Sequence, residues 1–318
     1  MYHNFIGIDI SKSTFTVAQF GQQLTKNFEN TPKGFQEFYK EYKKSLAQGL
    51  IILETTGGYE MALTSYLLDR SIALHRANSR KVKYFIRSLG KEAKSDAIDA
   101  AGLARYGYER HERLELFVMK SEPQTKLQQL VQRRLDLKQM LVQEKNRRQA
   151  PNQNTYITKS CDTLIKAFEE QLDTLQKEIQ ALIEMVPEQK EKQKILEEID
   201  GIGAIISGSL LALLPELGKV NRREIASLVG LAPHPYESGQ MVGYRKTKGG
   251  RSDVRCILFM AAMTASKSKG RLGEYYRGML EKGKKKMVAL TALMRKIIVI
   301  ANAKIKDWFT AQQLVALF

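Results

Sequence analysis

The sequence is poor in cysteine and has no long hydrophobic run. Its two cysteines, Cys161 and Cys256, lie far apart and have neither the pattern of a disulfide framework nor the spacing of a zinc site. The longest apolar stretch, residues 204–214, is much shorter than the ~20 residues that a membrane-spanning helix needs. The first residues, MYHNFIGIDISK, lack the basic start and apolar core of a signal peptide. We therefore expect a protein of the reducing cytoplasm.

Negative charge is also scarce. The chain has 34 Asp and Glu against 51 Lys and Arg, which gives a formal net charge of +17 at pH 7. Residues 240–306 alone hold 17 cations and three acids, a net charge of +14. This surplus favours a polyanionic partner, and the lack of a membrane span favours nucleic acid. The cations expected to contact phosphates are Arg245, Lys246, Lys248, Arg251, Arg255, Lys284, Lys285 and Lys286.

The length and composition predict two globular domains and a connector. The chain has 318 residues, of which 43% are hydrophobic and 27% charged, as in ordinary folded proteins. The pattern changes twice along the chain. We expect an α/β domain over 1–118, a helical coiled-coil connector over 119–192 and a mostly helical domain over 193–318.

The first 110 residues alternate between the periodicities of strands and helices. We expect strands at 5–10, 14–20, 23–28, 50–54 and 72–77. Helices are expected at 32–47, from the turn at 55–58 to about 68, at 79–88 and at 95–108. The first three strands follow one another directly, whereas the later ones alternate with helices. This order predicts a mixed sheet with helices packed on it.

The middle of the chain carries a heptad pattern. Seven apolar residues recur at intervals of three or four between charged flanks, as in a coiled-coil seam. They are Leu164, Phe168, Leu172, Leu175, Ile179, Leu182 and Val186. A looser apolar stripe precedes them over 127–141, and the sequence PNQN at 151–154 separates the two. Both an antiparallel helical hairpin within one chain and an intermolecular coiled coil fit this pattern.

Four acidic residues stand where a metal site could form. Asp9 and Glu54 each end an expected buried strand, where an unpaired charge would be costly. Asp96 and Asp99 are three residues apart on one expected helix and therefore point the same way. Taken singly, the helical pair could simply complement the helix dipole. Together, the four carboxylates could hold Mg²⁺, with Mn²⁺ as a substitute, and two such ions can support displacement at phosphorus.

A serine in a basic loop is the candidate nucleophile. Ser238 follows two prolines in PHPYESG at 233–239 and precedes a run of cations. Cations stabilise the charge that develops when an alkoxide attacks a phosphate. A solvated turn serine is the simpler interpretation from spacing alone. Tyr236 and Tyr244 are rival nucleophiles in the same loop, and His234 could act as a base.

The sequence IDGIG at 199–203 predicts a tight turn between two helices, like that of a helix-hairpin-helix. Such a turn could aim backbone N–H groups at a phosphate. It could equally be a turn between helices with no ligand. The sequence does not separate these two interpretations.

These motifs, in this order, resemble the Piv/MooV-type transposases and DNA invertases. These are DEDD recombinases of the insertion-sequence family called one-ten, with its eleven-eleven subgroup. The resemblance covers nearly the whole chain and rests on six motifs. They are GIDISK at 7–12, LETTG at 53–57, KSDAIDA at 94–100, IDGIG at 199–203, LVGLAPHPYESG at 228–239 and GGRSDVR at 249–255.

The resemblance implies a RuvC-like domain of the ribonuclease-H-like fold, with Asp9, Glu54, Asp96 and Asp99 around Mg²⁺. It implies that Ser238 forms a covalent phosphoserine link to DNA. It also implies a coiled coil that supports dimers or tetramers, and in related members a bridge RNA that guides the reaction. The expected function is that of a DNA transposase or site-specific recombinase acting on donor and target DNA.

Three other functions fit part of the sequence. One is a Piv-type DNA invertase, which inverts a fixed segment. Another is a metal-dependent junction nuclease, in which water attacks and the serine is incidental. The last is a binding protein that has kept the fold without the chemistry.

Overall fold

The computed structural model describes residues 2–90, 95–119, 121–235, 237–238, 241–243 and 245–315. The chain forms two compact units, Met1–Met119 and Lys120–Phe318. Each has its own hydrophobic core.

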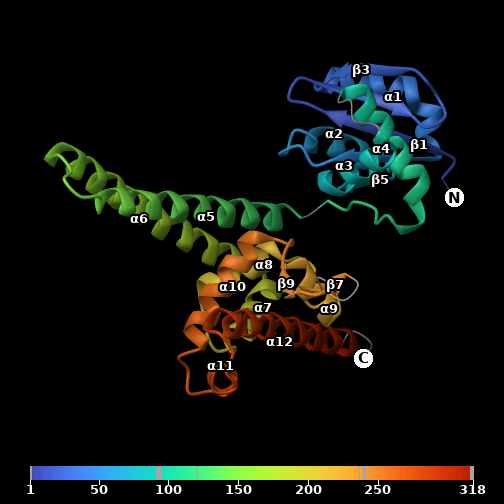
Figure 1. Ribbon diagram of the computed structural model, residues 1–318. Coiled ribbons are helices and arrows are strands. Elements are labelled where there is room, and N and C mark those ends of the chain that lie inside the picture. The colour runs from blue at the N-terminus through green and yellow to red at the C-terminus, as the bar shows by residue number, and fades with distance from the viewer. Residues whose placement is uncertain are drawn as a thin grey trace. The chain divides into compact units, whose positions relative to one another are not determined.

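A five-stranded mixed sheet organises the first unit, in the order β3-β2-β1-β4-β5 (Figure 1). The strands are β1 (Asn4–Ile10), β2 (Thr14–Gln19), β3 (Thr25–Glu29), β4 (Gly49–Glu54) and β5 (Leu74–Ala77). The first three pair antiparallel, and β4 and β5 add to β1 in parallel. The expected mixed sheet is confirmed, although β3 and β5 each begin two residues later than the sequence pattern predicts.

Helices cover both faces of this sheet. They are α1 (Pro32–Ala47), α2 (Met61–Leu68), α3 (Ser79–Ser88), α4 (Asp96–Arg110) and a short 3₁₀ turn, η1 (His111–Arg113). Apolar side chains of α1 and α2 pack on one face of the sheet, and those of α3 and α4 pack on the other. Two layers of helices enclose the sheet, so the central strands β1 and β4 are apolar on both faces.

Two long helices begin the second unit and pack along each other as a hairpin (Figure 1). They are α5 (Glu122–Arg148) and α6 (Thr155–Met185). The short connection at 149–154 makes them antiparallel. Two exposed ion pairs link them near the tip, Lys145 with Glu169 at 2.6 Å and Arg148 with Asp162 at 2.7 Å. The antiparallel hairpin, one of the two arrangements that fit the heptad pattern, thus forms within one chain.

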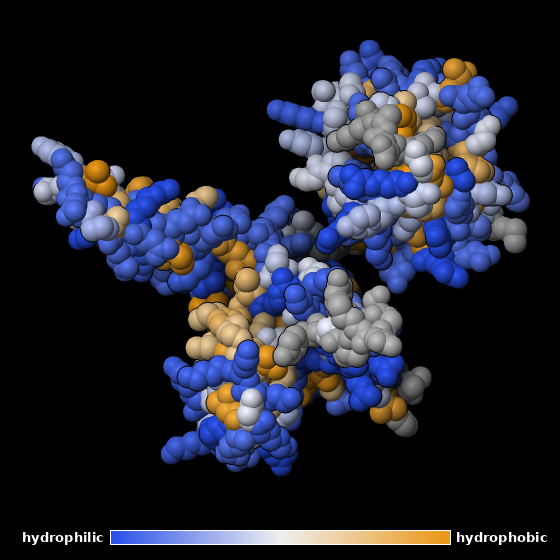
Figure 2. Space-filling view, in the orientation of Figure 1, coloured by the Kyte–Doolittle hydropathy of each residue, from blue (hydrophilic) through white to orange (hydrophobic). Residues whose placement is uncertain are grey.

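The apolar seam of the hairpin is only partly covered. At its base, Ile179 and Ile183 are buried against α5 and against Ala212 of a neighbouring helix. Towards the tip the seam is more open, and Leu164 is 43% exposed. The visible surface of the hairpin is mostly hydrophilic with separate hydrophobic spots (Figure 2).

The remaining helices pack around one core in the second unit. They are α7 (Pro187–Glu197), α8 (Ala204–Leu213), α9 (Arg222–Leu228), α10 (Ser252–Ala265), α11 (Arg271–Glu281) and α12 (Lys286–Val315). The turn at IDGIG joins α7 to α8, and a side chain on Gly201 would lie 2.3 Å from the carbonyl oxygen of Ala261. This turn therefore packs directly on α10. None of the helices in the described ranges is long and apolar enough to cross a membrane.

Candidate active site

Two of the predicted acids end neighbouring parallel strands. β1 and β4 run in parallel, and Ile8 pairs with Leu53 at the end of their register. Asp9 and Glu54 are the next residues on the two strands. Because the strands are adjacent, their carboxylates start from neighbouring positions at the same edge of the sheet. Both residues are partly buried.

The alternation of side chains places both acids on one face. Ile8 and Leu53 point into the core beneath α1 and α2. Phe5 and Ile52 point into the core beneath α3 and α4. Asp9 and Glu54 are an even number of residues from this second pair, so they share its face of the sheet.

Helix α4 brings the other two acids towards this edge. It lies across β1, β2 and β4 (Figure 1). Gly7, two residues before Asp9 and on the same face, touches the helix backbone: a β-carbon there would lie 2.0 Å from the carbonyl oxygen of Ala100. Asp96 and Asp99 occupy the first turn of α4, just before this contact. The contact at Gly7 thus fixes where the acidic turn meets the strand.

Replacing Gly7 by Ala tests this contact. The added methyl would also lie 2.3 Å from the backbone nitrogen of Ala104, and backbone atoms cannot move aside without shifting α4. We expect a loss of about 2–3 kcal/mol of unfolding free energy in the first unit. Urea unfolding followed by circular dichroism measures it. Gly278→Ala is the matched control, because Gly278 lies inside α11 and has open space around it. Equal stability of the two variants would contradict the close packing of α4 on β1.

The donor chemistry suits a hard divalent cation, because the four side chains offer only carboxylate oxygens. Their side chains do not form a ready ligand cage: within the described ranges, no three His, Cys, Asp or Glu side chains are grouped to hold a metal ion. The fold thus gathers Asp9, Glu54, Asp96 and Asp99 towards one edge of the sheet, without bringing three of them to ligating distances.

The loops that follow the two strand-end acids are tied together by hydrogen bonds. The amide of Asn30 donates to the carbonyl oxygens of Ser11, after β1, and Tyr59, after β4, at 3.0 and 3.1 Å. The hydroxyl of Ser79, the first residue of α3, donates to the carbonyl oxygen of Thr55 at 3.1 Å. These bonds hold the loop after Glu54 on both sides.

A buried carboxylate, which sequence analysis did not single out, organises the same loop. Glu60 is fully buried and accepts hydrogen bonds from the backbone N–H groups of Thr56 and Gly58, at 3.2 and 3.0 Å. The guanidinium of Arg76, on β5, donates to its other oxygen through two nitrogens. Burial alone would raise the pKa of Glu60, but the hydrogen bonds and the guanidinium outweigh it and hold that pKa below its usual value.

The Glu60→Gln variant should loosen this loop. It leaves the Arg76 guanidinium without its carboxylate, and breaking such a pair costs about 3 kcal/mol. Hydrogen–deuterium exchange over 55–60 should become faster at pH 7. Because the native pKa is lowered, the stabilisation is complete above the unfolded-state pKa of about 4.3 and is lost as the pH falls through the native value. The difference between wild type and variant should therefore shrink below about pH 4.

Glu41→Gln is the control for this variant, because it removes a carboxylate from an exposed ion pair with Lys26. Exposed pairs contribute about 0–1 kcal/mol. Equal protection of 55–60 in Glu60→Gln and wild type at pH 7 would contradict the role given to Glu60.

The serine loop lies in the second unit. Two short ladders form it: β6 (Pro233–His234) pairs with β9 (Lys246–Thr247), and β7 (Glu237–Ser238) pairs with β8 (Met241–Val242). The backbone of Ser238 is paired with Met241. The rival nucleophiles Tyr236 and Tyr244 lie outside the described residues. The loop is thus a pair of nested hairpins, closed at its base by His234 and Lys246.

The predicted nucleic-acid contacts fall into two groups. Arg251 and Arg255 are engaged within the protein. Arg251 forms a two-fold ion pair with Glu216 at 2.6 and 2.7 Å, and Arg255 donates to the carbonyl oxygen of Gly249 at 2.7 Å. The other predicted cations are exposed: Arg245, Lys246, Lys248, Lys284, Lys285 and Lys286.

Comparison with known proteins identifies two segments of the chain. Residues 6–151 match a family model described as a transposase, the DEDD type of IS110. Residues 193–277 match a second model, transposase IS116/IS110/IS902 family. The chain belongs to the IS110 family of transposases. It is an enzyme that acts on DNA, as the family resemblance predicted.

Two full-length relatives of this IS110-family protein are pilin gene-inverting proteins, one from Moraxella bovis and one from Moraxella lacunata. Each is 29% identical to it over 316 residues, which cover 96% of this chain and 97% of the relative. The DEDD match covers residues 6–119 of the first unit and continues through α5, and a DEDD transposase domain implies a ribonuclease-H-like fold. The acidic edge of the sheet lies within the first matched segment and the serine loop within the second.

Proposed function

We propose that this protein is a transposase or site-specific recombinase that cuts and rejoins DNA through a covalent link to Ser238. The observation that carries the proposal is that two strand-end acids and an acidic helix turn lie towards the same edge of the sheet. This edge belongs to the matched DEDD segment, and a serine loop lies in the matched transposase segment. Chemistry at a phosphodiester accounts for both features at once.

In the proposed step, the hydroxyl oxygen of Ser238 attacks a backbone phosphorus. A bond from serine oxygen to phosphorus forms, and the bond from phosphorus to one sugar oxygen breaks. The serine proton passes to solvent water, and the departing sugar oxygen takes up a proton from the solvent. One DNA end stays attached as a phosphoserine, so its bond energy is kept and a new sugar hydroxyl can rejoin it by the reverse reaction.

Asp9, Glu54, Asp96 and Asp99 would hold Mg²⁺ or Mn²⁺ in this proposal. A bound divalent ion neutralises phosphate charge and lowers the pKa of a bound oxygen. The carboxylates themselves set its place on the protein. The loop that follows Glu54 is ordered by hydrogen bonds of Glu60, Arg76 and Asn30. These three residues therefore have a positioning role in the proposal.

The family resemblance also supports a bridge RNA as guide and an assembly of two or four copies. Exposed cations such as Lys248 and Lys284 would hold phosphate backbones, which gives salt-sensitive affinity with little sequence preference. Base pairing to a guide would then supply the specificity.

DNA inversion is the second candidate outcome, and the two relatives favour it because both are named for inverting a pilin gene. A RuvC-like nuclease that uses water is the third. One assay distinguishes these three functions. The protein is incubated with a divalent metal, the proposed bridge RNA and a DNA that carries the two ends of the insertion element. Sequenced joints with new partners support transposition, joints with the segment reversed support inversion, and free ends without joints would overturn the recombinase proposal.

A further inference from the structure

A concave groove of about 940 Å³ opens in the second unit beside the base of the serine loop. Its walls come from α9, the β6–β9 ladder, α11 and the first half of α12. The ladder that forms one wall also closes the loop that carries Ser238. A molecule in this groove therefore lies next to the proposed nucleophile's loop. The volume is in the range of ligand-binding pockets.

The groove is lined by cations with few carboxylate partners. The six that line it are Arg222, Arg223, Arg245, Lys246, Arg295 and Lys296, and none of its lining residues is acidic. Among the described residues, only Arg245 of this set forms an ion pair, at 3.6 Å from Glu237. A concave surface with this much unneutralised positive charge attracts a polyanion.

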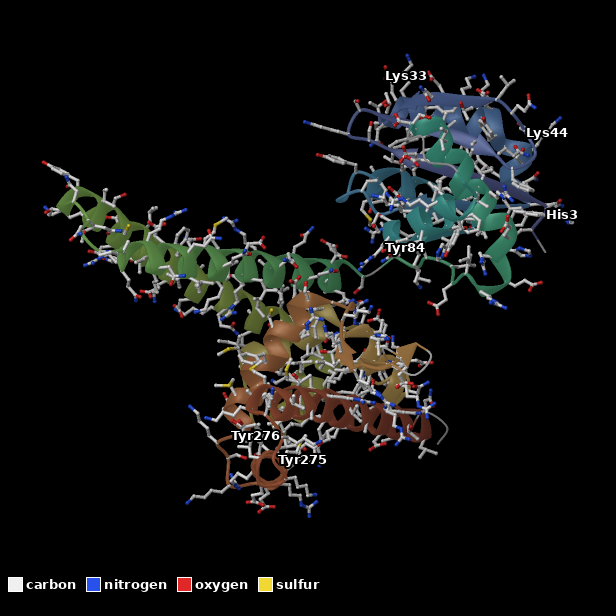
Figure 3. The ribbon with its side chains drawn as sticks, viewed as in Figure 1. His3, Lys33, Lys44, Tyr84, Tyr275 and Tyr276 are labelled. Carbon is white, nitrogen blue, oxygen red and sulfur yellow. The ribbon has the colours of Figure 1, made fainter. Side chains whose placement is uncertain are left out.

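One of these cations is held in place by an aromatic ring. The ammonium of Lys296, on α12, lies 3.9 Å from the ring centre of Tyr275. Tyr275 belongs to α11 and is labelled in Figure 3. This cation–π contact restricts an otherwise flexible side chain. Lys296 is therefore ordered on the groove wall before any ligand arrives.

The groove also has an exposed apolar wall. Met287 and Val288, at the start of α12, line it and are 59% and 51% exposed. Duplex DNA presents phosphates and sugars to a protein surface and keeps its bases stacked inside. Its phosphates would pair with the cations, but the apolar wall would stay exposed to solvent. An unpaired nucleotide offers a phosphate for the cations and a ring face for the apolar wall.

We propose that this groove binds an unpaired DNA strand, with its phosphates on Arg223, Lys296 and their neighbours and a base against Met287 and Val288. The lining has no carboxylate side chain that would repel these phosphates. The inference rests on the proposed function, because strand exchange next to Ser238 is what makes an unpaired strand available.

Binding of fluorescent oligonucleotides to the full-length protein tests this site. The probes are a duplex with a single-stranded tail, a blunt duplex of the same charge and an RNA of the tail sequence. Wild type should prefer the tailed DNA. Arg223→Ala with Lys296→Ala should bind it about tenfold more weakly at ~0.1 M salt, with a salt slope smaller by about 1.4. Lys267→Ala with Lys269→Ala, two exposed cations outside the groove, is the matched control.

The apolar wall has its own variant. Met287→Ala with Val288→Ala should bring tailed and blunt DNA to within about twofold of each other, and circular dichroism checks that each variant is folded. Three results would overturn the proposal: an unchanged preference in this variant, equal losses in the groove and control pairs, or tighter binding of RNA than of tailed DNA. Equilibrium binding needs no reaction at Ser238, so a failure of the covalent chemistry would leave this test unaffected.

Discussion

Replacing Ser238 by Ala should abolish the covalent protein–DNA adduct and all rejoined products. The methyl group cannot attack phosphorus, and loss of a nucleophile costs known serine enzymes about 10⁴-fold or more in rate. The adduct is measured as labelled DNA that stays with the protein after denaturation. The substitution removes only the hydroxyl oxygen and leaves the rest of the side chain in place. DNA binding should therefore be retained.

The two tyrosines of the same loop supply the controls for this result. Tyr236→Phe and Tyr244→Phe each remove a rival nucleophile and keep the ring. Both variants should still form the adduct. An adduct that persists in Ser238→Ala and disappears in one of the Phe variants would transfer the nucleophile to that tyrosine.

Asp9→Asn and Glu54→Gln should each lower the rate of DNA cleavage by about 10²–10³-fold. Both changes keep the size of the side chain and remove its charge at the sheet edge beneath α4. The cleavage rate at saturating protein measures the effect. Thermal unfolding checks that each variant is folded.

Two exposed acids of the same unit give matched changes away from the site. Asp69→Asn lies at the end of α2, and Glu37→Gln lies on α1. Neither should change the cleavage rate by more than about twofold. If Asp9→Asn and Glu54→Gln behave like these controls, the sheet edge has no part in the reaction, and a binding protein that kept the fold becomes the better description.

The sequence predicted the strands of the first unit well, because a strand is indicated by the residues within it. Alternating and continuous apolar residues gave the strands, and the position of an acid at a strand end followed directly from them. Parallel pairing of β1 with β4 makes Asp9 and Glu54 neighbours. The lack of a side chain at Gly7 lets α4 pack closely on β1. The resemblance to a known family supplied the roles of Asp96, Asp99 and Ser238, which spacing alone left open.

Features that depend on distant partners could not be read from the sequence. Glu60 follows a glycine turn and begins a helix, where an acid is ordinarily solvated, and nothing local indicates that Arg76 lies opposite on β5. Arg251 sits in a cationic run that suggests phosphate contacts, yet it pairs with Glu216. The groove between α9 and α12 joins segments about 70 residues apart, so only the fold brings its cations together.

The most direct test of the central claim is to map the trapped adduct by mass spectrometry. Wild-type protein is incubated with DNA and divalent metal, the DNA is digested, and the peptides are sequenced. We predict a nucleotide attached through phosphate to Ser238, formed only when Asp9 and Glu54 are intact. A nucleotide on Tyr236 or Tyr244, or cleaved DNA with no modified peptide, would contradict it.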